Sequence, residues 1–388
     1  MEQVQSKYSV TEIPKTQGIK YTGSKLKLLP HILALSKKIS GNFSGILSSD
    51  LKNISIFDGF SGSTRVSQAY AKTGYKIYAN DIAPYTKIFN TAFLLNTNEP
   101  NSYRSLIDHL NSLKPFNGWF TEHYGGEEEQ VSTNDSRIKK PWQIKNTRKL
   151  DVIRDEIDKL GLDEITKAVA ITSLIFALDK VDSTLGHFAS YLNEWSPRSY
   201  SDLKLEVPAL WVNENKNVVM NVDIFEALKQ LPNDIGIAYY DPPYGSNNEK
   251  MPPSRVRYAS YYHIWTTICL NDKPQIFGKA NRRIDTSDTI AGSVFEEFRK
   301  GESGKFIVIE AIEKLIRQTP ANHIILSYSS GGRATANELN EVLNSYGKVI
   351  EVKKINYKKN VMATMKWTND WIKETEENNF EYLFWVAK

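Results

Sequence analysis

Residues 54–81 read ISIFDGFSGSTRVSQAYAKTGYKIYAND. Residues 54–57 form a short apolar run that stops at the glycine-rich turn of residues 58–63. Residues 64–72 place apolar side chains at helical spacing, and residues 75–79 then alternate in the manner of a strand. The order strand, turn, helix, strand is typical of the opening unit of a doubly wound α/β sheet.

Later segments extend the predicted sheet. The short apolar runs at residues 235–240 and 323–328 indicate buried strands. Residues 349–357 and 381–386 predict a closing antiparallel pair, which is common at one edge of such a sheet. The predicted fold is therefore a Rossmann-like α/β sheet, mostly parallel, with an antiparallel edge strand.

The segment between the two halves of the sheet, residues 90–215, differs in character. It contains an acidic triplet at residues 127–129, a basic run, and a strongly helical pattern at residues 164–180. We predict that this segment is an inserted, largely helical domain. Residues 1–89 and 216–388 then form the domain that carries the sheet.

The composition predicts a soluble globular protein, because 40% of the 388 residues are hydrophobic and 24% are charged. No apolar run approaches the roughly 20 residues of a membrane helix, and the first ten residues lack the apolar core of a signal peptide. We therefore expect a cytoplasmic protein with no membrane partner. The single cysteine, Cys269, excludes an internal disulfide framework and a multi-cysteine zinc site, and we predict no metal site.

Positive charge is concentrated in two places, although the net charge is only +4. Such clusters are either solvated faces or contacts for a polyanion. The cations that we select as candidate nucleic-acid contacts are Lys139, Lys140, Arg148 and Lys149 in the first cluster, and Lys279, Arg282 and Arg283 in the second. The first cluster continues to Arg154.

The glycine-rich turn predicts a binding site for a nucleoside. Glycine lets the backbone approach a ligand closely, and the helix that follows offers free N–H groups at its amino end. The candidate contacts in the turn are Asp58, Phe60, Ser61 and Gly62. About 20 residues on, Asp81 follows the next strand, where a carboxylate can grip ribose hydroxyls, and Ile82 lies beside it. Asp81 can equally cap the following helix, and the two roles are compatible.

The tetrapeptide Asp241-Pro242-Pro243-Tyr244 follows the predicted strand at residues 235–240. Two prolines fix two φ angles, so the loop is rigid and lies at the carboxyl edge of the sheet, where ligands bind. The Asp241 carboxylate and the Pro242 carbonyl are both acceptors, and together they suit an amino group with two hydrogens. Tyr244 can offer a flat face to a base. The alternative is a proline-capped strand end with a capping aspartate.

Taken in order, these motifs resemble those of the α-class adenine-specific DNA methyltransferases, which include the Dam enzymes and many restriction-modification methylases. Residues 20–25 resemble the motif that lies against the methionine part of the cofactor, and residues 58–62 resemble the cofactor loop. Residues 80–81 resemble the ribose clamp, residues 221–225 the site for the cofactor's adenine, and residues 241–244 the catalytic loop.

The resemblance implies an enzyme that transfers a methyl group from S-adenosyl-L-methionine to the N6 amino group of adenine in double-stranded DNA. The base is flipped out of the duplex, and transfer is direct and in line. The catalytic residues are then Asp241, Pro242, Pro243 and Tyr244, and the remaining cofactor contacts are Lys20, Tyr21, Gly23, Lys25, Asp223 and Ile224. Residues 90–215 fall where the family has its target-recognition region. The resemblance also makes a cognate restriction endonuclease a possible partner.

Other functions compete with this interpretation. A cytosine-N4 methyltransferase shares the fold, although such enzymes more often carry serine in place of Asp241. A non-catalytic subunit could keep the fold to bind DNA or a partner, and RNA or protein are further targets. Methylation of the cytosine ring is not supported, because Cys269 follows Ile268 and not a proline. The added stretch at about 245–300 either contacts DNA or forms a lid, and its aromatic residues (Tyr258, Tyr261, Tyr262 and Trp265) could instead form a packed helix.

Overall fold

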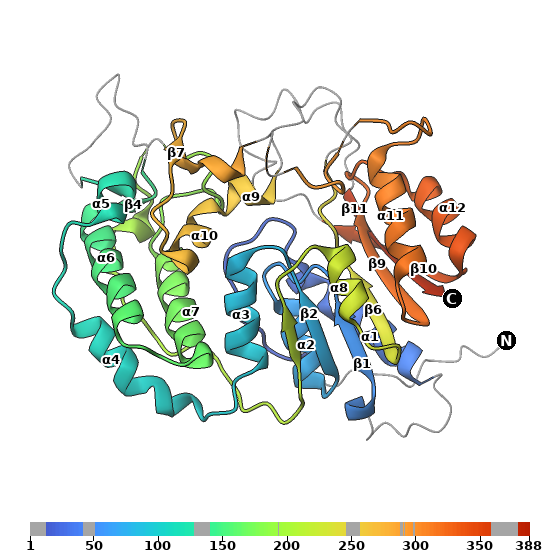
Figure 1. The fold of residues 1–388 in the computed structure, drawn as a ribbon, viewed down its shortest axis with the longest axis horizontal. Helices are drawn as coiled ribbons and strands as arrows, with labels where there is room; N and C mark the ends of the chain where they lie inside the picture. Colours follow the sequence, from blue (N-terminus) through green and yellow to red (C-terminus); the bar gives the residue numbers. More distant parts are fainter. Residues whose placement is uncertain are drawn as a thin grey trace.

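The computed structural model describes residues 13–41, 51–127, 140–192, 194–245, 257–287, 290, 292–297, 299–357 and 379–388. These residues form a seven-stranded sheet with the spatial order β10-β11-β9-β6-β1-β2-β5 (Figure 1). The strands are β1 (Ser55–Asp58), β2 (Lys76–Asn80), β5 (Val218–Met220), β6 (Ile235–Tyr240), β9 (His323–Ser329), β10 (Lys348–Tyr357) and β11 (Asn379–Ala387). The order confirms the predicted Rossmann-like α/β class.

The sheet is parallel from β5 to β9 and becomes antiparallel at its far edge. There β11 runs antiparallel to both β9 and β10, so the last strand of the chain lies between two earlier ones. The strand order reverses at β1, whose neighbours are β2 and β6. In an open α/β sheet this switch point, at the carboxyl ends of the strands, is where ligands bind.

Both faces of the sheet are covered, which explains the uninterrupted apolar strand sequences. In β6, Ile237 and Tyr239 pack on one face with residues of α1 (Leu29–Ser40) and α2 (Arg65–Thr73). Ala238 and Tyr240 pack on the opposite face with residues of α8 (Ile224–Gln230), α11 (Ile307–Gln318) and α12 (Ala336–Tyr346). These four β6 residues are at most 1% exposed, so the strand is buried on both sides.

A separate helical core lies beside the β5 end of the sheet (Figure 1). It contains α3 (Pro84–Leu94), α5 (Trp119–Tyr124), α6 (Ile144–Lys159), α7 (Glu164–Lys180) and α10 (His263–Leu270), with α4 (Arg104–Ser112) contributing from the outside. Residue 90, the predicted boundary, lies inside α3. The segment that contains α10 follows the catalytic loop in sequence and yet packs with the insertion, because Trp265 and Ile268 are buried in this core.

Among the helices of the described residues, none combines the length and the apolar character that crossing a membrane requires.

Candidate active site

The candidate site lies at the carboxyl ends of β1 and β6, on either side of the point where the strand order reverses. The backbone N–H of Gly59 donates to the carbonyl of Tyr239 at 3.0 Å, which joins the glycine-rich turn after β1 to strand β6. A side chain on Gly59 would place its Cβ 2.7 Å from the ring of Tyr240 and 3.0 Å from Ile224. Glycine is therefore required here by close packing.

Asp81 fixes the glycine-rich loop against the end of β2. Its carboxylate accepts the N–H of Gly62 at 2.8 Å and the N–H of Ala83 at 2.9 Å, the residue before α3. Gly62 has a φ of +47°, and a Cβ there would lie 3.2 Å from the ring of Tyr21. Burial raises the pKa of Asp81, while the backbone hydrogen bonds oppose that rise. Asp81 thus holds the residue that precedes α3, but it does not cap the helix, because α3 has no side-chain cap hydrogen bond.

The loop before α8 is attached to the same edge by Asn80. The Asn80 side chain donates to the carbonyl of Val222 at 3.1 Å and accepts its N–H at 3.2 Å. Asp223 is the N-cap of α8, where its carboxylate accepts the N–H of Phe225 at 2.9 Å, and the residue is exposed. Ile82 is 69% exposed beside this loop. A large apolar side chain this exposed next to fixed carboxylates suits a ligand with a flat apolar face.

Asp58 begins the glycine-rich turn and is fully buried. One carboxylate oxygen accepts the hydroxyl of Ser67 at 2.5 Å, whereas Oδ1 is buried without a hydrogen-bond partner. Burial, with a smaller contribution from the nearby Asp241 and Asp81, raises the pKa of Asp58 to about 7 against the lowering effect of the Ser67 hydrogen bond. A buried acceptor without a donor is costly, so this oxygen points to a polar group that the protein alone does not supply.

The catalytic loop brings together residues from the two ends of the chain and from its middle. Asp241 Oδ1 lies 2.9 Å from the Nζ of Lys25 and accepts the hydroxyl of Tyr244. Lys25 Nζ also lies 3.2 Å from Glu381 Oε1, and the Tyr244 hydroxyl lies 2.6 Å from the same oxygen. Lys25 is 5% exposed and Glu381 is 6% exposed, so this is a buried network.

Burial raises the pKa of Asp241 to about 6, because the Lys25 ammonium and the hydroxyl of Tyr244 only partly offset the loss of hydration and the repulsion from Glu381. The pKa of Lys25 is also raised, since Asp241 and Glu381 outweigh its own burial. Asp241 therefore remains a carboxylate at neutral pH and can act as a hydrogen-bond acceptor. Lys25, predicted to contact the cofactor, lies against Asp241, the residue predicted to be catalytic.

Aromatic residues after the catalytic loop hold the amino-terminal motif. The ring of Tyr21 stacks on Tyr262 at 4.6 Å and lies 5.5 Å from Tyr258. The Tyr262 hydroxyl accepts the N–H of Thr22 at 2.7 Å, and Tyr258 donates to the carbonyl of Thr22 at 3.2 Å. Tyr262 is fully buried, so these side chains form a packed cluster, which was the alternative to direct DNA contact.

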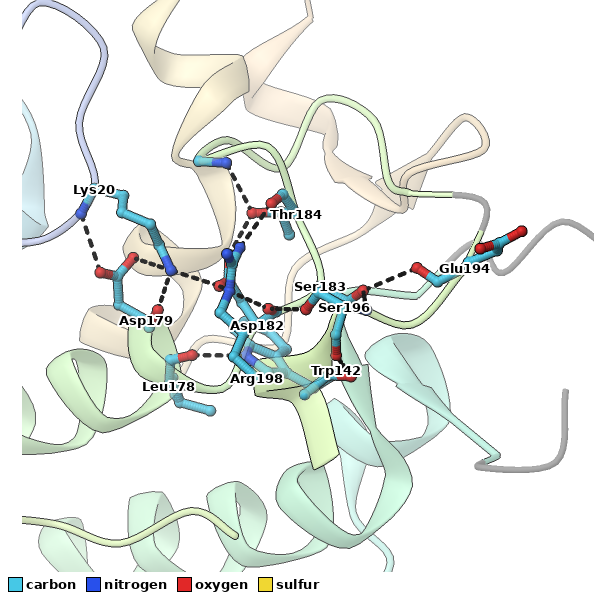
Figure 2. A network of polar contacts seen from close by, with 12 residues as sticks. Lys20, Trp142, Leu178, Asp179, Asp182, Ser183, Thr184, Glu194, Ser196 and Arg198 are labelled. Carbon is cyan, nitrogen blue, oxygen red and sulfur yellow. Dashed lines mark hydrogen bonds and ion pairs between the residues drawn. The ribbon is translucent and has the colours of Figure 1, made fainter. Parts of the chain in front are cut away.

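Lys20, predicted to contact the cofactor, pairs with residues of the insertion (Figure 2). Its ammonium lies 2.6 Å from Asp182 Oδ1 and donates to the carbonyl of Asp179, while its backbone N–H donates to Asp179 Oδ2 at 3.0 Å. Asp182 is 1% exposed and is also paired with Arg198 at 2.9 Å. Because the buried Asp182 and the half-buried Asp179 both pair with this cation, we leave Lys20 out of the proposed cofactor site.

Several of the predicted DNA contacts have structural partners. Arg283 is 3% exposed and forms ion pairs with Asp272 at 2.7 Å and Asp285 at 2.8 Å, so its guanidinium is not available to a phosphate. Lys149 donates to two backbone carbonyls at the end of α4, at 2.6 Å each. Three other candidates also donate hydrogen bonds within the protein: Lys140 to the carbonyl of His123, Arg148 to Asn117, and Arg282 to the carbonyl of Thr286. Lys279 is exposed. Lys139 lies outside the described residues.

Sequence reasoning missed Glu381, which lies on β11 and reaches the site across β9. The only local signal is a charged residue within an otherwise apolar strand, Glu381-Tyr382-Leu383-Phe384-Trp385-Val386. Buried carboxylates are rare unless they are paired, so this position could have been marked as a functional candidate. Nothing in the sequence identifies Lys25 and Tyr244 as its partners.

Comparison with known proteins matches residues 21–294 to the family described as D12 class N6 adenine-specific DNA methyltransferase. Modification methylase StsI of Streptococcus sanguinis is 27% identical over 360 residues, and the match covers 88% of this chain and 48% of the relative. Type II methyltransferase M.FokI of Planomicrobium okeanokoites is 25% identical, with 95% and 53% covered. Type II methyltransferase M.NlaIII of Neisseria lactamica is 24% identical, with 84% and 88% covered.

The chain thus spans about half the length of two of these relatives and most of the third. The family match covers more than two thirds of the chain and includes the glycine-rich turn, Asp81 and the Asp241–Tyr244 loop. It agrees with the enzyme class expected from the motif order. The chain belongs to the D12 class of N6 adenine-specific DNA methyltransferases.

Proposed function

We propose that this chain transfers a methyl group from S-adenosyl-L-methionine to the N6 amino group of adenine at a specific site in duplex DNA. The observation that carries the proposal is the position of Asp241. Its carboxylate lies at the end of β6, is ionised at neutral pH, and belongs to a loop joined through Tyr239 to the glycine-rich turn of β1. An acceptor for amino hydrogens and a nucleoside-binding loop therefore meet at one edge of the sheet.

The residues around the turn fit S-adenosyl-L-methionine, which supplies a methyl group on a sulfonium. The unpartnered Oδ1 of Asp58 and the carboxylate of Asp81 offer acceptors for its amino and hydroxyl groups. The exposed side chain of Ile82 and the buried Ile224 suit the two sides of its adenine ring, and Asp223 suits the adenine amino group. Phe60, Ser61, Gly62, Tyr21 and Gly23 complete the proposed cofactor site.

Adenine N6 is a poor nucleophile because its lone pair is delocalised into the ring. Asp241 and the Pro242 carbonyl would accept the two amino hydrogens and favour a tetrahedral nitrogen. S-adenosyl-L-methionine, when bound, would supply the methyl group from its sulfonium and leave as the neutral thioether, and Asp241 would accept the proton that the amino nitrogen loses. Positioning and electrostatics supply most of the rate enhancement, and no covalent enzyme intermediate is needed.

A flipped base costs a few kcal/mol, and stacking on the ring of Tyr244 would recover roughly 1–3 kcal/mol of it. Contacts to phosphates would come from exposed cations such as Lys279, which lies at the turn between β7 (Ile276–Phe277) and β8 (Arg282–Arg283). We further propose that the methylated site is that of a cognate restriction endonuclease, as the names of the relatives suggest for them.

The proposal is tested by sequencing genomic DNA, one molecule at a time, from a methylation-free bacterial host that expresses this chain. We expect N6-methyladenine at one short recurring sequence. If cytosine amino groups are methylated instead, the enzyme class would stand but the target base would be cytosine and not adenine. Unmodified DNA, together with measurable binding of S-adenosyl-L-methionine, would instead favour a non-catalytic subunit.

We expect Asp81→Ala to weaken binding of S-adenosyl-L-methionine by about tenfold to a hundredfold, because a charge-assisted hydrogen bond contributes roughly 1.5–3 kcal/mol. Isothermal titration calorimetry would measure the dissociation constant. Asp81→Asn is the matched control, since its amide oxygen can still accept the N–H of Gly62 or Ala83 and support the loop. An unchanged dissociation constant in the alanine variant would remove Asp81 from the cofactor site.

A further inference from the structure

Glu381 meets the catalytic loop from the opposite end of the chain. On β11 it pairs in register with Ser329 of β9, and its Oε1 accepts the hydroxyl of Ser327 at 2.9 Å. The same oxygen lies 2.6 Å from the Tyr244 hydroxyl and 3.2 Å from Lys25 Nζ. Ser327 is fully buried, so this carboxylate is held in place by the sheet itself.

The hydroxyl of Tyr244 lies between two carboxylates and has a single hydrogen. It can therefore donate to Asp241 or to Glu381, but not to both at once. The two carboxylates compete for one hydroxyl hydrogen, so a stronger hydrogen bond from Tyr244 to Glu381 means a weaker one from Tyr244 to Asp241 Oδ1.

Lys25 is shared in the same way. Its ammonium has three hydrogens, and three acceptors surround it: Asp241 Oδ1 at 2.9 Å, Glu381 Oε1 at 3.2 Å and the carbonyl of Gly23 at 3.1 Å. Asp241 Oδ1 thus receives a cation and a hydroxyl while no base is bound. An amino group that approaches this oxygen competes with both hydrogen bonds.

We propose that Glu381 is a positioning residue that takes over the hydrogen bond of Tyr244, and a larger share of Lys25, when the target adenine enters. Asp241 Oδ1 is then released to accept an amino hydrogen, and no buried donor is left without a partner. This inference rests on the proposed function, because it assigns Glu381 a part in the same reaction.

The test is Glu381→Gln in the full chain, assayed with DNA that contains the site found by sequencing. Glutamine keeps the shape of the side chain but is a weaker acceptor, because it carries no charge. We expect kcat to fall by on the order of tenfold, with the dissociation constant for S-adenosyl-L-methionine and the melting temperature nearly unchanged. Glu351→Gln is the matched control, since Glu351 lies on the neighbouring strand β10 and pairs with surface Lys38.

The pH profile separates positioning from a merely structural role. Glu381 raises the pKa of Asp241, so its neutralisation should move the acidic limb of kcat to lower pH. The titratable and charged groups that face Asp241 are Lys25, Asp58, Tyr239, Tyr244, Tyr258 and Glu381. Only Glu381 is altered in this variant. An acidic limb that stays at its wild-type pH would overturn the inference.

A double-mutant cycle with Tyr244→Phe tests the competition directly. Without the hydroxyl, Glu381 has one donor fewer to take over, so Glu381→Gln should reduce kcat by a smaller factor than it does in the wild-type protein. If the factor by which the double variant lowers kcat equals the product of the factors for the two single variants, the proposed coupling is contradicted. A wild-type chain that methylates no DNA would remove the proposed function and this inference together, whereas an active wild type with multiplicative variants removes the inference alone.

Discussion

Asp241→Ala is expected to lower kcat for methyl transfer by on the order of 10³-fold, while the dissociation constant for S-adenosyl-L-methionine stays close to that of the wild type. In the proposed reaction Asp241 is the charged acceptor for the amino hydrogens, and preorganised hydrogen-bonding groups of this kind contribute about 10²–10³ in rate. Its side chain contacts Lys25 and Tyr244 and is not among the groups that hold the glycine-rich loop. Rapid-quench transfer of a labelled methyl group and calorimetry would measure the two quantities.

The matched control is Asp241→Asn, which keeps the size of the side chain and removes its charge. Lys25 retains Glu381 and the carbonyl of Gly23 in either variant, so the buried ammonium is not left alone. We expect asparagine to be nearly as inactive as alanine, because its amide oxygen carries no charge, is a weaker acceptor than the carboxylate and cannot take up a proton. Loss of cofactor binding together with activity would indicate damage to the fold and would not support a chemical role.

In the wild type, activity should decline as the pH falls below about 6, the value to which burial raises the pKa of Asp241. The protonated carboxyl group has lost one of its acceptor positions and repels an amino hydrogen. This sign is the opposite of that expected if a protonated Asp241 served as a general acid.

Strands β1, β6 and β9 could be predicted because each is a short, mostly apolar run followed by a turn, whereas the three-residue strand β5 was not predicted. The run predicted at residues 54–57 is β1 (Ser55–Asp58), and the run predicted at residues 235–240 coincides with β6. Gly74 ends α2 with a φ of +105°, as expected for a glycine after a helix. These features depend on neighbours within a few residues, which a single sequence displays directly.

Long-range pairing could not be predicted in this way. Lys20 and Lys25 occur in one short motif, and yet the structure directs the first to Asp182 in the insertion and the second to Asp241 in the catalytic loop. Glu381 reaches Lys25 only because β11 is placed beside β9. Which carboxylate a lysine meets is decided by the order of strands in space, and local patterns carry little information on that order.

The basic run posed a related difficulty, since a cation on a surface and a cation in a core look alike in a sequence. Arg154 continues the predicted DNA-binding run and is 1% exposed. Its guanidinium donates to the carbonyls of Ile268 at 2.6 Å and Cys269 at 3.2 Å, at the end of α10, and forms an ion pair with Asp158 at 2.9 Å. Arg154 therefore joins the insertion to the segment that follows the catalytic loop.

Arg154→Met should accordingly lower the free energy of unfolding by roughly 2–4 kcal/mol, because each buried acceptor that is left without its donor costs roughly 1–3 kcal/mol. Two carbonyls at the carboxyl end of α10 would lose their donor, and methionine fills most of the volume without replacing the hydrogen bonds. Urea denaturation followed by circular dichroism would measure the change. The dependence of DNA affinity on salt should stay the same, because a buried guanidinium releases no counterion from DNA.

Lys279→Met is the contrasting control, because Lys279 is exposed at the turn between β7 and β8. Its unfolding curve should match that of the wild type, while the slope of log affinity against log salt concentration should fall by about 1 for the loss of one phosphate contact. The opposite pattern, with a changed salt slope for Arg154→Met and normal stability, would place Arg154 on the DNA and contradict its role between α6 and α10.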